Sequence, residues 1–456
     1  MIQFKKAILL YLSCALGLVS ISGCGGSSNE IPPPNGFLYS GNSARPGSMA
    51  AFTVTTGSLG HITNSPFATT ANNAPNAPYS LAAWPPPQAA PAAAVTTKFL
   101  YGGIPASQKG GVITRVLGRQ LVGTVTGGIL MMPINSDHTL GTAQIVFLPP
   151  KNDDFDPIAV TPSPGNFLYA IDLTTSNLLA FSIDSNNGTL AAIGPAAGVA
   201  VGPDAFNVVV DPQGKFVLVA NCNCVTSPGT GSVQTFSING DGTLTSLGIF
   251  VPGGAASGAQ PIALAVSPDS KFLFIASLDN KVYVESVTNG ALTDQGKAAL
   301  PAGSMPLAIA ISNDIGVNNA NVSQALGSYI YTGNAATHSL SFFINCVETN
   351  TNTATPCMGV VGPLGIPSMN SSIPFTGAVG AMLADPTNPP PTTPNTAVAA
   401  GFVYVTDYDH GVVESFSITS TDECIGILNC IPGTLTLSGA SGNTGGVNPV
   451  GLAIAH

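Results

Sequence analysis

Hydrophobic and polar positions along the chain fall into short runs that recur. One run starts with an aromatic residue, and its seven copies are Phe37–Tyr39, Phe99–Tyr101, Phe167–Tyr169, Phe216–Val219, Phe272–Ile275, Tyr329–Tyr331 and Phe402–Val405. A second apolar run, usually opened by proline, alternates with it: Pro78–Ala83, Pro157–Val160, Phe206–Val210, Pro261–Val266, Pro306–Ile311, Val379–Leu383 and Pro449–Ile454. Apolar runs of this length, bounded by turn residues, predict β-strands.

Two more strands follow each aromatic run. Val233–Ile238 alternates apolar and polar residues, and Asp241-Gly242 then supplies the positive φ angles of a two-residue hairpin turn. Four antiparallel strands repeated seven times predict an all-β, seven-bladed β-propeller. The chain enters on a second strand (Phe37) and finishes on a first strand (Pro449), so we expect the C-terminal strand to pair with the N-terminal blade and close the ring.

Composition agrees with this fold and excludes other classes. Charged residues make up 7% of the chain, too few to cover the polar faces of a helical bundle. A hydrophobic fraction of 45% argues against intrinsic disorder. A net charge of −10 with 12 basic residues argues against a nucleic-acid partner, because such binding rests on Lys and Arg.

The N-terminal residues have the pattern of an export signal. Two lysines precede the apolar run Ala7–Val19, which is too short to span a membrane. Ile21–Cys24 then resembles the lipobox of bacterial lipoproteins, which implies cleavage before Cys24 and a lipid on its thiol. An ordinary signal with a chance cysteine is the alternative. Without Asp at position 25, the resemblance implies an outer-membrane lipoprotein of the cell envelope. We expect a signal peptide at 1–23, a flexible tether at 24–35 and the propeller at 36–456.

The repeat itself is similar to that of a known family. The succession Pro-Ile-Ala-Val, turn, Gly-Lys-Phe, Val-x-x-Phe-Ser-Ile and Asn-Gly-Thr-Leu resembles the seven-bladed lactonases typified by 6-phosphogluconolactonase, and their YVTN-repeat relatives, over residues 36–456. The resemblance implies a His near the first strand of a middle blade, but Asp204–Val210 has none. Three arginines in the chain also make a sugar-phosphate site a poor fit, so 6-phosphogluconolactone is not the expected substrate, whereas a neutral lactone remains open.

Strand order predicts which loops share one end of the ring. We expect the loops between second and third strands to lie at the same end as the connections between blades, because the strands are antiparallel. The candidate residues lie in or next to these loops and connections. The candidate catalytic residues are His338, His410 and Arg45, and the candidate binding residues are Arg115, Arg119, Asp156, Asp172 and Asp407. Such a set offers a base for water and a cation for a developing oxyanion. The alternative is that charges gather in loops because the strands are apolar. The sequence contains no HExxH motif, no phosphate loop and no GxSxG elbow, so no cofactor or metal is expected at this face.

The cysteines predict disulfides in an exported protein. Cys346 with Cys357 and Cys424 with Cys430 each bracket a hairpin between third and fourth strands, in blades six and seven. Cys222 and Cys224 either pair across one residue, hold a metal or remain free.

These observations favour a lipid-anchored, cell-envelope propeller that binds a polysaccharide or protein partner. The alternative function is a lactonase-like hydrolase of a neutral lactone.

Overall fold

The computed structural model divides the chain into two compact units, Met1–Pro34 and Asn35–His456. All residues that the structure describes lie in the second unit. They are 36–43, 47–55, 57–70, 77–86, 98–105, 127–149, 155–162, 165–225, 229–301, 303–312, 315–319, 322–326, 329–345, 363–364, 372–385, 401–419, 435–439, 441–446 and 448–455. They form strands and turns, and no helix among them is long and apolar enough to cross a membrane.

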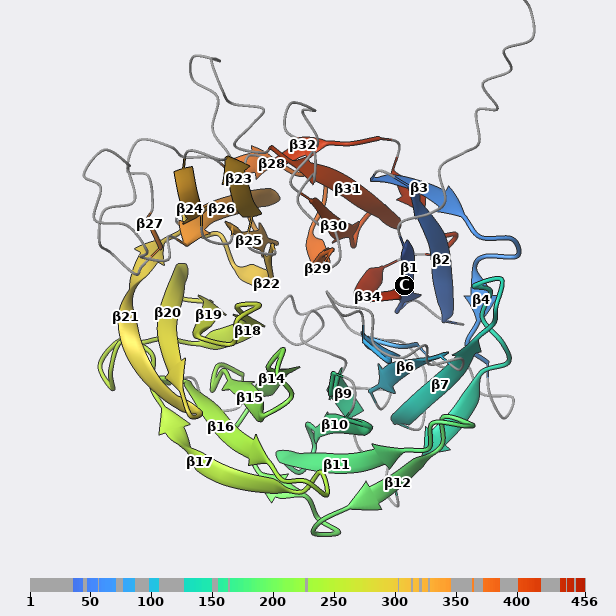
Figure 1. The fold of residues 1–456 in the computed structure, drawn as a ribbon, viewed down its shortest axis with the longest axis horizontal. Helices are drawn as coiled ribbons and strands as arrows, with labels where there is room; N and C mark the ends of the chain where they lie inside the picture. Colours follow the sequence, from blue (N-terminus) through green and yellow to red (C-terminus); the bar gives the residue numbers. More distant parts are fainter. Residues whose placement is uncertain are drawn as a thin grey trace, which may run out of the picture. The chain divides into compact units, whose positions relative to one another are not determined.

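The strands form seven four-stranded antiparallel blades arranged in a ring (Figure 1). Blade 1 contains β34 (Pro449–Ala455), β1 (Gly36–Asn42), β2 (Ser48–Thr55) and β3 (Ser58–His61). Blade 2 contains β5 (Ser80–Trp84), β6 (Lys98–Ile104), β7 (Gly128–Ile134) and β8 (Gln144–Phe147). Blade 3 contains β9 (Phe155–Val160), β10 (Phe167–Asp172), β11 (Asn177–Ile183) and β12 (Leu190–Ile193). Blade 4 contains β14 (Ala205–Val210), β15 (Phe216–Asn221), β16 (Ser232–Ile238) and β17 (Leu244–Phe250).

The second half of the ring follows the same order. Blade 5 contains β18 (Pro261–Val266), β19 (Phe272–Ser277), β20 (Lys281–Thr288) and β21 (Ala291–Ala299). Blade 6 contains β22 (Pro306–Ile311), β25 (Tyr329–Asn334), β26 (Ser339–Asn345) and β27 (Pro363–Leu364), and blade 7 contains β29 (Val379–Ala384), β30 (Phe402–Asp407), β31 (Val412–Ile418) and β32 (Leu435–Leu437). Short strands extend four blades, namely β4 (Phe67–Ala68), β13 (Val199–Ala200), β28 (Ser372–Pro374) and β33 (Gly442–Asn443), and β23 (Ile315–Asn319) forms a separate hairpin with β24 (Val322–Leu326). The predicted fold class is confirmed.

The C-terminal strand closes the ring as the sequence predicts. β34 pairs antiparallel with β1, and Phe37 lies opposite Ala455. Val450 and Ile454 of this strand are buried. Blade 1 is therefore assembled from both ends of the propeller sequence. Pairing with β34 covers the edge of β1 that would otherwise lack a hydrogen-bonded neighbour.

The aromatic runs connect each blade to the next one. The hydroxyl of Tyr101 in blade 2 donates a hydrogen bond to the carbonyl of Gly188 in the blade 3 hairpin at 2.8 Å, and Tyr169 in blade 3 bonds Gly242 of blade 4 in the same way at 2.9 Å. A Cβ on Gly188, whose φ is +75°, would lie 2.6 Å from the ring of Phe99. Glycine is thus required there both by the turn and by the aromatic ring of the preceding blade.

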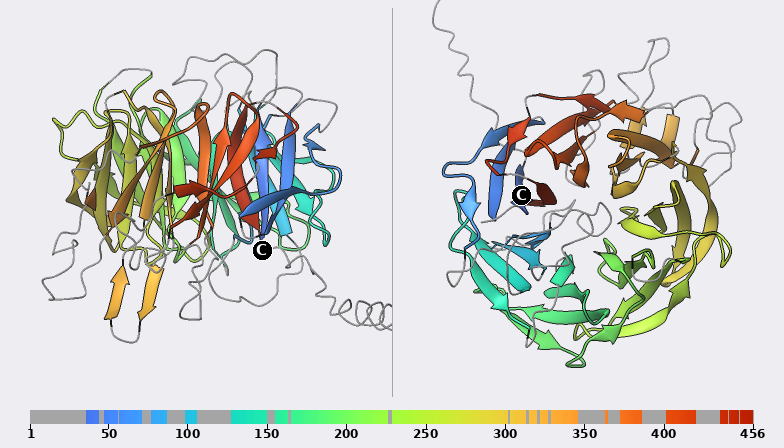
Figure 2. Two further views of the ribbon diagram at one scale, coloured as in Figure 1. Left: turned by 90° about the horizontal axis from the view of Figure 1, so that it is seen from above. Right: turned by 180° about the vertical axis from the view of Figure 1, so that it is seen from behind.

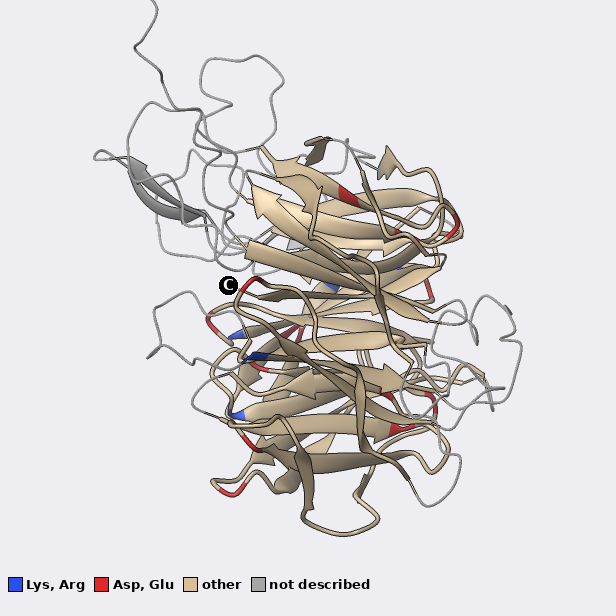
Figure 3. Ribbon diagram, turned by 90° about the vertical axis from the view of Figure 1, so that its right-hand side faces the viewer, with Lys and Arg blue, Asp and Glu red and all other residues tan. Residues whose placement is uncertain are grey.

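Antiparallel order gives the ring two different ends. The first strand of each blade lines the centre of the ring. At one end of the ring the first strands begin, and at the same end the loops join the second strands to the third strands. We call this end the 2–3 face, and it also receives the connections between blades; Figure 2 gives the side view. Figure 3 shows how sparse the charged residues are, with most of them near turns and strand ends.

Candidate functional site

The centre of the ring is a channel walled by the seven innermost strands. In the part of the chain that the structure describes, its cavity of about 210 Å³ is lined by three consecutive residues at each of those strands, with Tyr79 directly before β5. Strand pairing aligns these triplets, since their third residues, such as Ile158, Val208 and Leu264, lie opposite equivalent positions of the second strands. The lining therefore consists of three rows of seven equivalent residues.

The first row, nearest the 2–3 face, is mainly large and apolar. It contains Tyr79, Asp156, Phe206, Ile262, Leu307, Gly380 and Val450. Five of these seven side chains belong to one continuous hydrophobic cluster, which draws buried residues from six blades. Among the described residues of the lining Asp156 is the one charged residue, and it is 4% exposed.

The second row is made of small or short residues. It contains Ser80, Pro157, Asn207, Ala263, Ala308, Ala381 and Gly451. Asn207 has a structural role, because its Oδ1 accepts a hydrogen bond from the backbone N–H of Leu264 in the next blade at 3.2 Å. The third row is aliphatic except for Met382. Small side chains in the middle row leave room for the channel.

Asp172, a predicted binding residue, stabilises a turn of the 2–3 face. Its Oδ1 accepts hydrogen bonds from the backbone N–H groups of Thr174 and Thr175, and its Oδ2 accepts one from the Thr175 hydroxyl at 2.5 Å. Side chains of Asp commonly hold turns in this manner. A structural role therefore accounts for this carboxylate.

Asp407 and His410 form the one Asp–His pair among the described residues. His410 Nδ1 lies 2.8 Å from Asp407 Oδ2; the carboxylate is fully buried, whereas the imidazole is 58% exposed. Asp407 also accepts hydrogen bonds from the N–H of His410 and from the hydroxyl of Thr376. The hydrogen bond to Asp407, and then its charge, raise the pKa of His410 above its ordinary value. An exposed imidazole oriented by a buried carboxylate has the arrangement of a general base.

The same pair is also an ordinary turn of this fold. Asp407 ends the second strand of blade 7 as Asp172 ends that of blade 3, and His410 stands three residues later, where blade 3 has Thr175. His410 thus makes the contact to the carboxylate that Thr175 makes in blade 3. A role in holding the turn is sufficient to explain the contact between His410 and Asp407, without any catalytic role. The exposed imidazole nevertheless gives blade 7 a titratable side chain where blade 3 has a threonine hydroxyl.

His338 lies in the equivalent turn of blade 6 and is exposed. Its φ of +46° places it in the left-handed region, and its carbonyl accepts a hydrogen bond from the N–H of Phe375. Neither His338 nor His410 lines the channel, so Asp156 is the one predicted site residue that does so among those described. Arg45, Arg115 and Arg119 lie outside the described residues, and their roles stay predictions.

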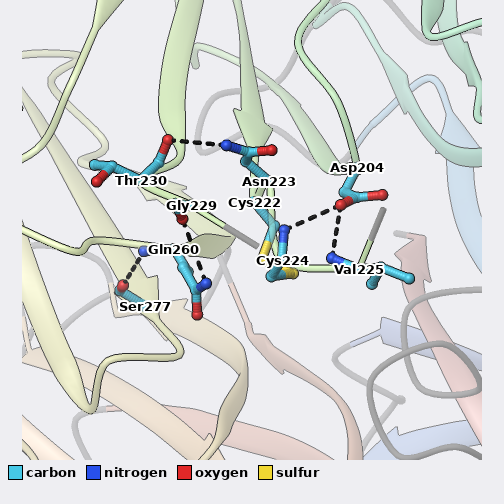
Figure 4. Close-up of a disulfide and its surroundings, with 9 residues drawn as sticks. All are labelled: Asp204, Cys222, Asn223, Cys224, Val225, Gly229, Thr230, Gln260 and Ser277. Atoms are coloured by element: carbon cyan, nitrogen blue, oxygen red, sulfur yellow. Dashed lines mark hydrogen bonds between the residues drawn. A yellow bond between two sulfur atoms is a disulfide. The ribbon is translucent and has the colours of Figure 1, made fainter. Parts of the chain in front are cut away.

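Cys222 and Cys224 form a disulfide at the end of β15 (Figure 4). Asp204 fixes this loop on the 2–3 face, since its carboxylate accepts hydrogen bonds from the N–H groups of Cys224 and Val225 at 3.0 and 2.8 Å. Cys222 is buried in the same hydrophobic cluster as Phe206. Cys346, Cys357, Cys424 and Cys430 lie outside the described residues. Within the described ranges no group of His, Cys, Asp or Glu could hold a metal ion.

Sequence reasoning missed that Asp156 has an aromatic residue on either side of it. In the first row Tyr79, directly before β5, precedes it, and Phe206 of β14 follows it. An alignment of the seven apolar runs would have exposed the relationship, because Asp156 stands two residues before the position shared by Leu81, Ile158 and Val208. The interpretation of Asp156 as part of a connecting loop concealed it.

Comparisons with known proteins agree on the fold. No protein-family model matches the chain, and no curated protein sequence matches it. A solved protein from Lactobacillus plantarum is similar, with a TM-score of 0.56 and 14% identity over 92% of this chain and 99% of that one. A protein from Bacteroides uniformis, described as a candidate 6-phosphogluconolactonase, has a TM-score of 0.55 and 16% identity over 92% and 99%. At such identities the likeness shows the seven-bladed propeller, with lactonase-like structural neighbours.

Proposed function

We propose that the protein is a binding propeller of the cell envelope, anchored by a lipid on Cys24, that takes part of its partner into the central channel at the 2–3 face. The partner is a polysaccharide or a protein. The observation that carries the proposal is the central channel itself, a concave cavity whose described lining combines apolar side chains with polar groups and the carboxylate of Asp156. Concave cavities in which a few polar groups stand among apolar side chains are typical binding sites.

The same lining argues against a sugar-phosphate substrate. Phosphate is normally held by Arg, Lys or clustered backbone amides. None of the described residues that line the cavity is Lys, Arg or His, and the carboxylate of Asp156 would repel an anion. Binding of a neutral or cationic group is the use that this channel supports.

The proposal is tested by filling the channel. Ala381 lines the cavity and is half-buried, so Ala381→Phe should occupy its space. Ala192→Phe, on the exposed outer strand β12, is the matched control. We expect envelope oligosaccharides or peptides that bind the full mature protein in calorimetry to lose about tenfold or more in affinity with Ala381→Phe and little with Ala192→Phe. Equal affinity of both variants would refute a channel site.

A second candidate function rests on the pair of Asp407 and His410. With the buried carboxylate fixing Nδ1, the imidazole is able to take a proton from water that attacks a neutral lactone. Its test is hydrolysis of a panel of neutral lactones by the mature protein, with and without EDTA, compared with His410→Gln. Hydrolysis that His410→Gln abolishes would support the hydrolase, and hydrolysis unaffected by this change would exclude His410 as its base.

A further inference from the structure

The disulfide between Cys222 and Cys224 encloses a single residue, Asn223, in the loop that follows β15 on the 2–3 face (Figure 4). Asn223 has a φ of +51°, in the left-handed region that favours glycine and that Asn tolerates better than most residues. Closing so short a loop removes little conformational freedom from the unfolded chain, so this disulfide contributes less to stability than one that joins distant residues. Stabilisation of the fold is therefore a weak explanation for the pair.

Hydrogen bonds hold the same segment independently of the disulfide. The N–H of Cys222 donates to the backbone carbonyl of Asp204, and the N–H of Cys224 donates to the carboxylate of Asp204, both at 3.0 Å. The N–H of Asn223 donates to the carbonyl of Pro203 at 3.2 Å. These bonds do not involve the sulfur atoms, so reduction would leave the loop attached to the connection between blades 3 and 4, with the two cysteine side chains still adjacent.

The two cysteines differ in their access to solvent. Cys222 is 0% exposed and packs in the hydrophobic cluster that contains Phe206. Cys224 is half-buried, and Val225 directly after it is 42% exposed. Thiol–disulfide exchange needs access to one sulfur atom, which Cys224 offers and Cys222 does not. As a free thiol, Cys222 would behave as a small apolar side chain of the cluster.

We propose that Cys222 and Cys224 form a thiol–disulfide exchange site, whose substrate is a thiol carried by a peptide or a small molecule. The substrate thiolate attacks Sγ of Cys224, the bond between the two sulfur atoms of the protein breaks, and Cys222 leaves as a thiolate that takes up a proton. A second substrate thiolate then attacks the substrate sulfur of the mixed disulfide and releases Cys224, which is protonated in turn. Two substrate thiols are thereby oxidised to one disulfide, and the protein disulfide is reduced to two thiols.

The test is reduction of the folded protein by glutathione. The full mature protein is incubated in mixtures of reduced and oxidised glutathione, free thiols are trapped with a maleimide, and peptides containing Cys222 and Cys224 are quantified by mass spectrometry. We expect excess reduced glutathione to reduce this pair while the melting temperature stays within a few degrees of that of the oxidised protein. A pair that is reduced only after unfolding, or that is already free in the air-oxidised protein, would overturn the proposal.

Two single variants form a matched pair for the site of attack. Cys222→Ala leaves Cys224 as the free thiol, and Cys224→Ala leaves Cys222. We expect oxidised glutathione to form a mixed disulfide about tenfold or more faster with Cys222→Ala than with Cys224→Ala, because only Cys224 is accessible. Equal rates would contradict attack at Cys224. If either variant does not fold, the mixed disulfide trapped in the wild type must map to Cys224, and its mapping to Cys222 would contradict the proposal equally.

A second arm identifies the source of the thiol. A reduced cysteine-containing peptide replaces glutathione, and both thiols are compared at equal concentration. Faster reduction by the peptide supports a polypeptide substrate of the exchange site, and equal or slower reduction supports a small thiol. The channel test with Ala381→Phe uses neither cysteine, so the exchange site and the proposed function succeed or fail separately.

Discussion

Glu285 in blade 5 occupies the position at which blade 4 buries Phe236. Both residues lie on the third strand, opposite the equivalent second-strand residues Leu273 and Val217. The other blades place Phe or Met there, namely Phe52, Met132, Phe181, Phe343 and Phe416. Glu285 is 0% exposed, and neither carboxylate oxygen has a hydrogen-bond partner among the described residues.

Burial raises the pKa of Glu285 from 4.5 to about 8, and the charge of Asp294 on the paired strand adds to the effect. The folded state therefore holds a proton that the unfolded state releases between these values, so this residue makes the protein less stable as pH rises from about 5 to 8. The loss is at most about 4–5 kcal/mol. We expect Glu285→Phe to raise the melting temperature at pH 8 and to remove this pH dependence.

The reciprocal change is the matched control for Glu285. Phe236→Glu in blade 4 should introduce a similar loss of stability between pH 5 and 8 in urea unfolding experiments. A melting temperature of Glu285→Phe that falls with pH as steeply as that of the wild type would contradict the assignment.

The second prediction concerns His410. Because Asp407 stabilises the imidazolium, the histidine pKa measured by NMR should lie above 6.5 in the wild type and return toward it in Asp407→Asn. The pair stabilises the fold fully below the ordinary pKa, and this contribution disappears as pH rises through the raised value. An unchanged His410 titration in a folded Asp407→Asn protein would show that the contact does not exist in solution.

The third prediction tests the closure of the ring. Deleting residues 448–456 removes β34, with the buried side chains of Val450 and Ile454, and bares the edge of β1. Each such side chain is worth about 1.5–3 kcal/mol, a large share of the roughly 5–15 kcal/mol that stabilises a domain. We expect a lower melting temperature and aggregation in size-exclusion chromatography. A monomer that melts within a few degrees of the wild type would show that β34 is dispensable.

The fourth prediction concerns the remaining cysteines. Peptide mapping without reduction should find Cys346 joined to Cys357 and Cys424 joined to Cys430, in addition to the pair of Cys222 and Cys224. Each added bond closes a short loop, so its stabilisation should be at most about 3 kcal/mol. Crosslinks between blades six and seven would contradict this pairing.

The fifth prediction concerns the anchor. Cys24→Ser removes the thiol that would carry the lipid, so fractionation should move the protein from the membrane to the soluble fraction. Wild-type protein that incorporates no labelled palmitate would show that Cys24 is not lipidated.

The sequence alone was sufficient for the fold. Local signals determine each unit, since the apolar and aromatic runs recur in every blade and turns such as Asp241-Gly242 recur in blades 3, 4 and 5. Repetition makes the prediction robust. Phe37 and Pro449 predicted even the closure of the ring, because four strands per blade leave one strand missing at the start of the chain.

The tertiary structure decided which residues share a site. Tyr79, Asp156 and Phe206 lie far apart in the sequence, and they come together because the ring places equivalent positions of successive blades side by side. The contact of His410 with Asp407 likewise depends on the conformation of the turn that joins them, which the composition of the chain does not reveal. The exclusion of water around Asp156 and Glu285, which changes the chemistry of a carboxylate, is a property of packing between blades.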